Sequence, residues 1–354
     1  MEWHKFLQLA ITGLLVASFP LSIVWARKQE ARYVKLCGLL LFLTFDLIVF
    51  GAYTRLSDSG LGCPDWPGCY GHANPLQAHA QISAAEAAMP HGPVTVFKAW
   101  VEMIHRFLAM GIGILITTMC VLAWQRRKTQ PVGAMAYWLF ALVCVQGAFG
   151  AWTVTMKLQP LIVTIHLLLG MLLLAMIAWH WARLHPMPPA PQAGGLRMWA
   201  RLALVIVFCQ IALGGWVSTN YATLACMEFP MCQGRWLPEM DWGHGFTLWR
   251  ELGKTGGGDW LPFAALTAIH WLHRNFAWLV LAVCGVLAWR ARGAHPRAAR
   301  MIGALLLAQF CTGLLTIYFK FPLLLALLHN AGAAALVLCL SMLNSRLDRC
   351  PDRP

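Results

Sequence analysis

The sequence is poor in charged residues. Asp, Glu, Lys and Arg make up only 12% of its 354 residues, and 59% are hydrophobic, whereas a soluble domain usually has about 25% charged residues. This shortage excludes an ordinary soluble domain and predicts a polytopic membrane protein. Acidic residues are the scarcer kind, and the formal net charge is +13. Because the positive residues lie mostly in short loops and form no basic stripe with interleaved aromatics, we expect no nucleic acid partner.

Several motifs that hold metals or cofactors are absent. There is no C-x-x-C-H motif, which disfavours covalently attached c-type haem. The spacings C-x-x-C and H-x-x-x-H are also missing, so a zinc site is a weaker expectation. The first apolar run lacks a basic n-region and a clear small-residue cleavage site, and we interpret it as a retained helix rather than a signal peptide.

Long apolar runs recur along the whole chain. A transmembrane helix needs roughly 20 apolar residues, and nine runs near this length fall at about 6–26, 36–56, 99–124, 132–153, 161–182, 198–219, 263–289, 301–319 and 322–344. Of the 27 Lys and Arg residues, 17 lie in loops that nine spans would place on one side. Positive loops stay in the cytoplasm, or in the matrix of a mitochondrion. We expect a multi-pass protein of the inner membrane of a bacterium, with its N-terminus outside and its C-terminus cytoplasmic.

The two halves of the chain repeat each other at an offset of 163 residues. The matching pairs are Gly51 and Gly214, Cys63 and Cys226, Pro67 and Pro230, Cys69 and Cys232, Gly71 and Gly234, Gln146 and Gln309, Gly150 and Gly313, and His166 and His329. We therefore expect an all-α fold of two tandem four-helix bundles, 36–182 and 198–344, related by a pseudo-twofold axis along the membrane normal. Residues 1–35 would add an extra N-terminal transmembrane helix and a cytoplasmic loop, 183–197 a cytoplasmic linker, and 345–354 a cytoplasmic tail.

One apolar run contains a cluster of ionisable residues. Residues 100–109 read W-V-E-M-I-H-R-F-L-A and contain Glu102, His105 and Arg106. Ionisable groups are costly inside a bilayer, so this cluster is a functional-site hypothesis by default. Glu102 and His105 are three residues apart and share one face of a helix. Residues 269–277, I-H-W-L-H-R-N-F-A, repeat the His-Arg pair.

Each predicted half has one histidine on its second helix and one on its fourth. The pairs are His105 with His166, and His273 with His329. Three of the four lie about 10 Å below the outer helix ends, and His273 lies about 16 Å below. Two imidazoles on neighbouring helices could ligate a haem iron from both faces. The alternative is an ordinary packed histidine, which is less expected for four histidines paired by a repeat.

His270 leaves the alignment of the second site open. It takes the place of Glu102 if the two His-Arg pairs are aligned, and the place of His105 if the inner helix ends are matched. We favour His273 as the ligand because an arginine follows it. Only the first site then has a carboxylate one turn from its histidine. Two similar pockets with different chemistry suggest one reactive site and one electron-transfer or structural site.

An arginine follows the expected ligand on each of these two helices. Arg106 and Arg274 have planar guanidinium groups that pair well with carboxylates, and haem propionates are an obvious partner. The alternative is that each side chain snorkels to the outer interface.

Two cysteine pairs lie in the predicted outer loops. Cys63 with Cys69, and Cys226 with Cys232, both have C-x5-C spacing and enclose a proline. An oxidising compartment permits a disulfide within each pair, which would pin the loop over the outer helix ends. Redox-active thiols are the alternative, and the spacing does not separate the two.

Taken together, these motifs resemble the haem A synthase family. The resemblance rests on G-A-Y-T-R-L-S-D-S-G-L-G-C-P-D-W-P-G-C at 51–69, E-M-I-H-R at 102–106, I-H-L-L-L-G at 165–170, H-W-L-H-R at 270–274 and L-H-N at 328–330. These segments extend over nearly the whole chain. The family core has eight helices, so the extra first helix is a departure from it.

The resemblance implies an enzyme that oxidises a ring methyl of haem O to the formyl group of haem A, by successive hydroxylations, for cytochrome oxidase assembly. The family's functional positions fall here on the substrate-haem ligands His105 and His166, the catalytic carboxylate Glu102, the iron ligands of a haem b cofactor His273 and His329, and the cysteine pair Cys63 and Cys69. The implied partners are haem O and membrane lipid. The haem O synthase, a quinone or other electron acceptor, and a second copy of the chain are candidate partners.

Three other functions are compatible with parts of this pattern. A diheme b-type membrane cytochrome that transfers electrons to or from quinone would have the same four histidines, but it would not need Glu102 in one half only. A quinone-linked disulfide oxidoreductase would explain the outer cysteines, but such proteins usually have C-x-x-C spacing. A haem transporter would explain the repeat and would predict no conversion of haem O.

Overall fold

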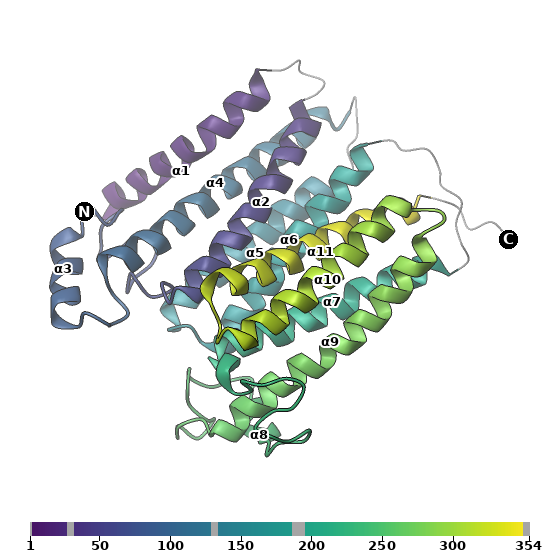
Figure 1. Ribbon diagram of the computed structural model, residues 1–354. Helices are drawn as coiled ribbons and strands as arrows, with labels where there is room; N and C mark the ends of the chain where they lie inside the picture. The colour runs from purple at the N-terminus through teal and green to yellow at the C-terminus, as the bar shows by residue number, and fades with distance from the viewer. Residues whose placement is uncertain (1, 27–31, 129–133, 186–194, 350–354) are drawn as a thin grey trace. The chain divides into compact units, whose positions relative to one another are not determined.

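The protein is built from helices (Figure 1). The computed structural model describes residues 2–26, 32–128, 134–185 and 195–349, and its regular elements within these ranges are all helical. Nine of these helices are long and apolar enough to cross a membrane: α1 (Glu2–Trp25), α2 (Arg32–Leu56), α4 (Val96–Arg126), α5 (Met135–Thr155), α6 (Pro160–Leu184), α7 (Leu196–Thr219), α9 (Phe263–Ala291), α10 (Pro296–Tyr318) and α11 (Leu323–Leu347). The prediction of an all-α polytopic membrane protein with nine spans is confirmed.

The ends of the spans follow local capping signals. Thr95 caps α4, because its hydroxyl accepts the N–H of Lys98 at 3.2 Å. Gln159 caps α6 by accepting the N–H of Ile162 at 2.8 Å, directly before the proline that starts the helix. The hydropathy pattern does not predict the short elements of the long loops, which are α3 (His79–Ala88), η2 (Ala222–Leu224) and α8 (Trp242–Gly245).

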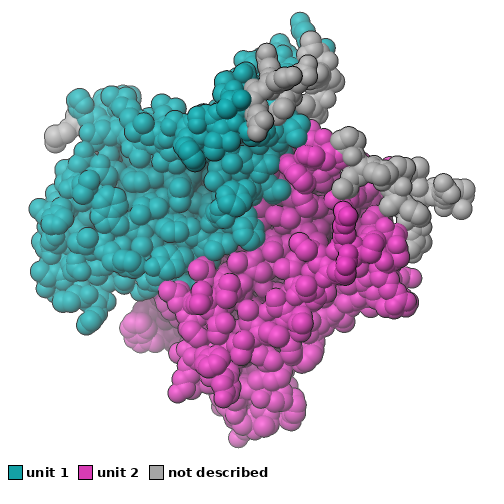
Figure 2. All heavy atoms as spheres, turned by 45° about the horizontal axis from the view of Figure 1, so that its top comes forward, with its two compact units in different colours: residues 1–158 teal, residues 159–354 magenta. Residues whose placement is uncertain are grey.

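The chain forms two compact units, residues 1–158 and 159–354, which are coloured separately in Figure 2. Helix α6 belongs to the second unit, where it packs against α7 and α11, although the repeat assigns it to the first half. The boundaries 36–182 and 198–344 rest on sequence symmetry and stay predictions. Some predicted features lie outside the described residues, namely 186–194 of the linker, 350–354 of the tail, and the loop residues Arg27, Lys28 and Arg353.

Helix α4 is the central helix of the first unit. It packs against α1, α2, α3 and α5, and Figure 1 shows α1 running alongside it. The two helices approach closely at Gly111, where a Cβ atom would lie 2.7 Å from Cγ1 of Val16. Near the start of α1, Leu9 is buried in one hydrophobic cluster with Cys63 and Cys69. The extra N-terminal helix therefore covers the first cysteine pair.

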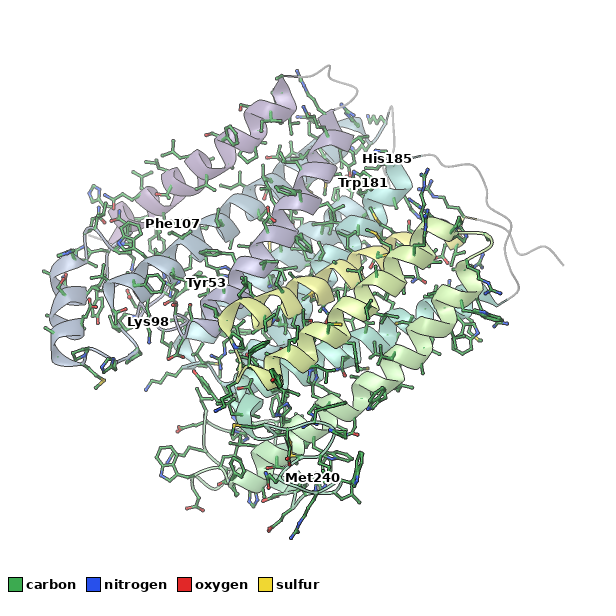
Figure 3. All side chains as sticks on the ribbon, viewed as in Figure 1. Tyr53, Lys98, Phe107, Trp181, His185 and Met240 are labelled. Carbon is green, nitrogen blue, oxygen red and sulfur yellow. A yellow bond between two sulfur atoms is a disulfide. The ribbon has the colours of Figure 1, made fainter. Side chains whose placement is uncertain are left out.

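Helix α11 holds the second unit together. It packs against α6, α7 and α10, and α9 packs against α7 and α10. Near the end of α11, Asn344 Nδ2 donates to the carbonyl of Ala200 on α7 at 2.9 Å. At the end of α6, the ring of His185 lies 4.1 Å from that of Trp181, measured between centroids, and both are labelled in Figure 3.

The 163-residue repeat is also present in the backbone conformation. Residues with left-handed φ angles occur in pairs at this offset: Asp58 and Tyr221, Tyr70 and Gln233, Gly71 and Gly234, Lys157 and Lys320, and Leu158 and Phe321. The peptide bonds before Pro67 and Pro230 are both cis. Most of these pairs differ in side chain, so the two halves share a loop geometry that tolerates different residues.

Candidate functional site

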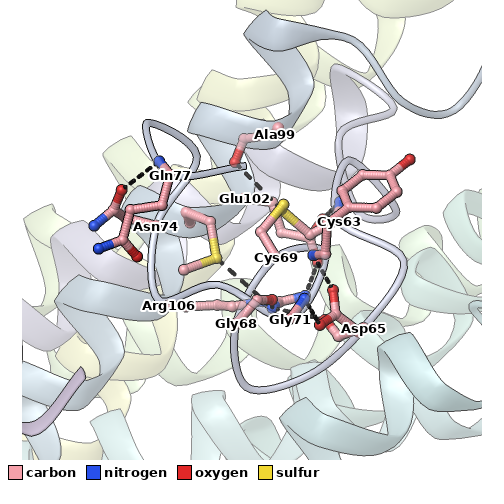
Figure 4. The surroundings of a disulfide bond; sticks show 12 residues. Cys63, Asp65, Gly68, Cys69, Gly71, Asn74, Gln77, Ala99, Glu102 and Arg106 are labelled. Atoms are coloured by element: carbon pink, nitrogen blue, oxygen red, sulfur yellow. Dashed lines mark hydrogen bonds and ion pairs between the residues drawn. A yellow bond between two sulfur atoms is a disulfide. The ribbon is translucent and has the colours of Figure 1, made fainter. Parts of the chain in front are cut away.

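The first disulfide loop is folded by its own polar groups. Cys63 and Cys69 are disulfide-bonded, and Asp65 lies between them in the sequence. The carboxylate of Asp65 accepts the backbone N–H of Tyr70 at 2.6 Å and that of Gly71 at 2.8 Å. Figure 4 shows this loop against α4, with the side chains of Glu102 and Arg106 directed toward it.

Gly62 brings this loop into contact with the backbone of α4. A Cβ atom at position 62 would lie 2.4 Å from the carbonyl carbon and oxygen of Lys98, so a larger residue would push the loop away. The N–H of the next residue, Cys63, points at α4 and donates to Oε2 of Glu102 at 2.8 Å. Glu102 is only 4% exposed, so this contact fixes a buried carboxylate.

Arg106 completes the arrangement from one turn further along α4. Its Nη2 pairs with Oε1 of Glu102 at 2.5 Å. Its Nη1 donates to the loop carbonyls of Asp65 at 3.0 Å and Gly68 at 2.6 Å. We call Glu102, Arg106 and Cys63 the Glu102 corner. Arg106 already binds a carboxylate and three loop carbonyls, and its predicted pairing with a haem propionate stays a prediction.

His105 lies beside this corner and packs against α2. A Cβ atom at Gly51 would lie 3.0 Å from Cε1 of the His105 ring. The ring of Phe50 stacks on that of His105, with centroids 6.2 Å apart and planes 22° apart. The predicted partner, His166, is on α6 in the other compact unit. The pairing of these two histidines therefore stays a prediction.

The second unit has a corner of the same design with a different central residue. Cys226 and Cys232 are disulfide-bonded, and the N–H of Cys226 donates to Nδ1 of His270 at 3.3 Å. Nη2 of Arg274 donates to the carbonyls of Pro230 at 3.1 Å and Met231 at 3.3 Å. We call His270, Arg274 and Cys226 the His270 corner.

This geometry decides the alignment that the sequence left open. His270 accepts the N–H of Cys226 as Glu102 accepts that of Cys63, so His270 is the counterpart of the carboxylate. His273 packs against Gly214, where a Cβ atom would lie 2.9 Å from its Cε1, in the same way as its counterpart in the first unit packs against α2. The two His-Arg pairs are therefore the equivalent ones.

His273 and His329 both lie in the second unit, and neighbouring helices hold both. Gln210 Nε2 donates to the carbonyl of His273 at 3.1 Å, and Gln309 Nε2 donates to that of His329 at 2.9 Å. The ring of His329 lies 3.4 Å from the Cβ position of Gly313. The pairing of these two histidines as ligands of one iron stays a prediction.

Outside the spans, the long loop before α9 is ordered by polar contacts. Arg250 donates to Oδ1 of Asn220, and to the carbonyl of Lys254 at 3.2 Å. Burial lowers the pKa of the Arg250 guanidinium. Hydrogen bonds from the backbone and the ring of His244 lower the pKa of the Asp241 carboxyl group. These contacts fix the shape of the loop that carries the second cysteine pair.

Sequence reasoning missed three residues that touch the predicted ligands. Phe50 stacks on His105, Gln210 holds His273, and the hydroxyl of Thr312 lies 2.9 Å from Nδ1 of His329. The glycines of the repeat could have indicated these residues. Phe50 and Thr312 each directly precede a glycine that packs against a predicted histidine ligand, and Gln210 lies four residues before Gly214, which does the same.

The chain is similar to known proteins along most of its length. A family model described as cytochrome oxidase assembly protein matches residues 34–341, so α1 lies before the matched region. A protein of Shewanella oneidensis named heme A synthase is 37% identical over 315 residues, which cover 87% of this chain and 94% of that protein. Proteins of the same name from Beijerinckia indica and a Bradyrhizobium species are 30% and 29% identical, over 83% and 84% of this chain and 87% and 86% of those proteins.

Proposed function

Because the chain belongs to the haem A synthase family, we propose that it oxidises a ring methyl of haem O to the formyl group of haem A, by successive hydroxylations, for cytochrome oxidase assembly. The Glu102 corner carries this proposal, since it holds a buried carboxylate one turn from His105. At the equivalent position the second unit has His270. Methyl oxidation releases protons, and a fixed carboxylate beside the substrate can accept them.

The substrate site of the proposal is built around His105. His105 is the proposed ligand of the haem O iron in the first unit, and His166 stays the second ligand predicted from the sequence. Gly51 leaves room for the edge of the His105 ring, and Phe50 packs along its face. These two α2 residues limit how the ring can turn, so α2 orients the ligand while α4 supplies the carboxylate.

The residues of the second unit fit a haem b cofactor held by His273 and His329. Each ring packs against a glycine, and each backbone carbonyl accepts a glutamine N–H. Nδ1 of His329 is engaged by a hydroxyl, which leaves Nε2 as the nitrogen available to iron, as in other histidine-ligated haem proteins. Haem b, when bound, supplies one-electron transfer. Arg274 has a buried Nη1 with no partner among the described residues, so it is the better placed of the two arginines to bind a propionate.

Glu102 has the role of proton acceptor in this proposal. Its Oε2 binds the N–H of Cys63 and its Oε1 binds Arg106. A carboxylate has about four lone-pair positions, and the contacts with Cys63, Gly62 and Arg106 leave room for a proton or an ordered water. The disulfide loop fixes the orientation of these positions, which gives the Cys63–Cys69 pair a structural part in the reaction.

The proposal places the protein in the inner membrane of a bacterium. The loops rich in Lys and Arg then face the cytoplasm and both disulfide loops face outward. An outward position supplies the oxidising compartment that disulfides require. The proposed partners are the haem O synthase as the source of substrate and a quinone or another electron acceptor.

The test is a haem extraction from cells that make haem O, with and without this chain. We expect haem A, identified by chromatography of acid–acetone extracts, only when the chain is present. The Glu102→Ala variant should keep haem b and lose the conversion. Unchanged haem O in well-aerated cells, with haem b in the purified protein, would contradict the proposal and favour a diheme b-type cytochrome that exchanges electrons with quinone.

A further inference from the structure

Four helices share a five-residue pattern ahead of the predicted ligands. The pattern ends in glycine, and in three of the four cases it begins with glutamine: L-I-V-F-G at 47–51, Q-G-A-F-G at 146–150, Q-I-A-L-G at 210–214 and Q-F-C-T-G at 309–313. Each segment lies on the membrane-spanning helix that precedes the spanning helix of one of the four histidines. The fourth position, directly before the glycine, also changes in character, from phenylalanine or leucine to threonine.

The structure shows what the constant positions do. The glycines at 51, 214 and 313 receive the edges of the rings of His105, His273 and His329. The glutamines at 210 and 309 donate to the backbone carbonyls of the histidines that they face. The pattern therefore sets the register between two helices at the level of a ligand.

The variable fourth position meets the ring itself. Phe50 stacks on the His105 ring, which is an apolar contact. Thr312 places its hydroxyl 2.9 Å from Nδ1 of His329. Leu213 is the matching residue on α7 and has no hydroxyl. Nδ1 of His273 is buried, and the ring interacts with the backbone of Gln210 as that of His329 does with the backbone of Gln309. The two predicted haem b ligands therefore differ in whether a threonine hydroxyl reaches Nδ1.

The direction of the hydrogen bond at Thr312 follows from its other contacts. The hydroxyl has one hydrogen, and the carbonyl of Ala308, one turn back, lies 2.7 Å from its oxygen. We assign the hydrogen to this contact because it is the shorter of the two carbonyl contacts of the hydroxyl. The oxygen is then an acceptor for an N–H at Nδ1 of His329. The proton then sits on Nδ1, and the lone pair on Nε2 is available to a metal.

We propose that Thr312 is a positioning residue that fixes the tautomer of His329 and lowers the reduction potential of haem b. This proposal rests on the proposed function, which assigns His329 to the haem b iron. An acceptor at the outer nitrogen makes a histidine a more basic ligand. A more basic ligand stabilises ferric iron over ferrous iron, because it donates more electron density, and the axial ligand is one of the protein's levers on potential.

The test is a redox titration of the haem b absorption bands in purified holoprotein from cells that make no haem O. In Thr312→Val, which keeps the side-chain shape, we expect the ferric-over-ferrous preference to fall about tenfold, which raises the midpoint potential by about 59 mV for one electron. In Leu213→Thr, which offers His273 an acceptor, we expect a shift in the opposite direction. Thr312→Ser should restore the parent potential.

Thr316→Val is the matched control, because Thr316 is one turn further along α10 and its hydroxyl binds the carbonyl of Thr312. It should leave the potential unchanged.

An unshifted potential in Thr312→Val with low-spin haem retained, or an equal shift in Thr316→Val, overturns the proposal. If Thr312→Val does not fold, the Leu213→Thr variant is the test. An unchanged haem b potential in Leu213→Thr would then overturn the proposal. Low-spin haem b that survives in His329→Ala would instead show that the ligand assignment of the proposed function is wrong.

Discussion

The Glu102 corner and the His270 corner are two versions of one construction. In both, a disulfide loop lies against a long helix, a cysteine N–H points at a side chain of that helix, and an arginine one turn further on binds the loop carbonyls. The first corner is the tighter one. Its cysteine N–H is 2.8 Å from the acceptor, against 3.3 Å in the second, and its arginine also pairs with that acceptor.

The difference between the corners is one of chemistry on a shared scaffold. The loops, the turns and the arginines are kept, and the acceptor changes from a carboxylate to an imidazole. A carboxylate that pairs with arginine carries a charge, and a buried pair of this kind is strongly destabilised when one partner is removed. The comparison teaches that one scaffold holds a carboxylate in the first unit and an imidazole in the second, and the proposed proton chemistry would use only the carboxylate.

The largest effect should come from the acceptors themselves. In Glu102→Gln, the amide oxygen can still accept the N–H of Cys63, but the side chain can no longer serve as a base. We expect production of haem A to fall about 100-fold or more, with haem b retained. His270→Gln, the matched change in the second corner, should keep most of the conversion. Quantification of haem A and haem b in extracts of both variants checks this, and an equal loss in both would remove the distinction between the corners.

A second variant tests why the first loop lies closer to its helix. In Gly62→Ala, the new Cβ meets backbone atoms of Lys98 that cannot turn aside, so the loop must shift and Cys63 must move away from Glu102. We expect a loss of about 3 kcal/mol in unfolding free energy and faster hydrogen exchange in the loop. The equivalent residue of the second corner is Ala225.

Ala225→Gly is the control for this change, and it should cost only about 1 kcal/mol. Thermal unfolding of both variants in the same detergent provides the measurement. A melting temperature of Gly62→Ala equal to that of the parent protein would show that the close approach is not needed.

The smallest effect should come from the arginines. Lysine keeps the charge but loses the planar fork that binds several acceptors at once. Arg106 binds a carboxylate and loop carbonyls, so Arg106→Lys should cost about 2 kcal/mol. Arg274 binds loop carbonyls and lies over the ring of Phe229, and Arg274→Lys should cost about 1 kcal/mol. Unfolding of the two variants by a chemical denaturant gives the ranking, and the reverse order would contradict the view that the first corner is the tighter one.

Much of the fold was predictable because lipid imposes a simple rule. A span must be long and apolar, and the predicted runs match the nine helices of the described chain to within a few residues at most ends. The short helices α3 and α8 were not predicted, because they lie in polar loops, where no such rule applies. The cysteine pairs were visible from their spacing, and the structure joins both.

The candidate site was predictable by residue type but not by contact. Glu102, His105 and Arg106 stood out because ionisable residues are rare in a span. The binding of Arg106 to the first loop was not predictable, because it depends on how residues about 40 positions apart meet. The contact of Thr312 with His329 was not predictable for a related reason, since threonine in an apolar helix usually bonds its own backbone.

The sequence by itself determined the membrane class, the number of spans, the 163-residue repeat and the residues able to do chemistry, because hydrophobicity, charge and spacing are properties of the chain. Only the tertiary structure decided which of those residues act together. It made His270 the counterpart of Glu102, and it directed Arg106 to the first disulfide loop. The physical reason is that a hydrogen bond needs a partner within about 3 Å in the right direction, and packing rather than sequence separation sets that distance.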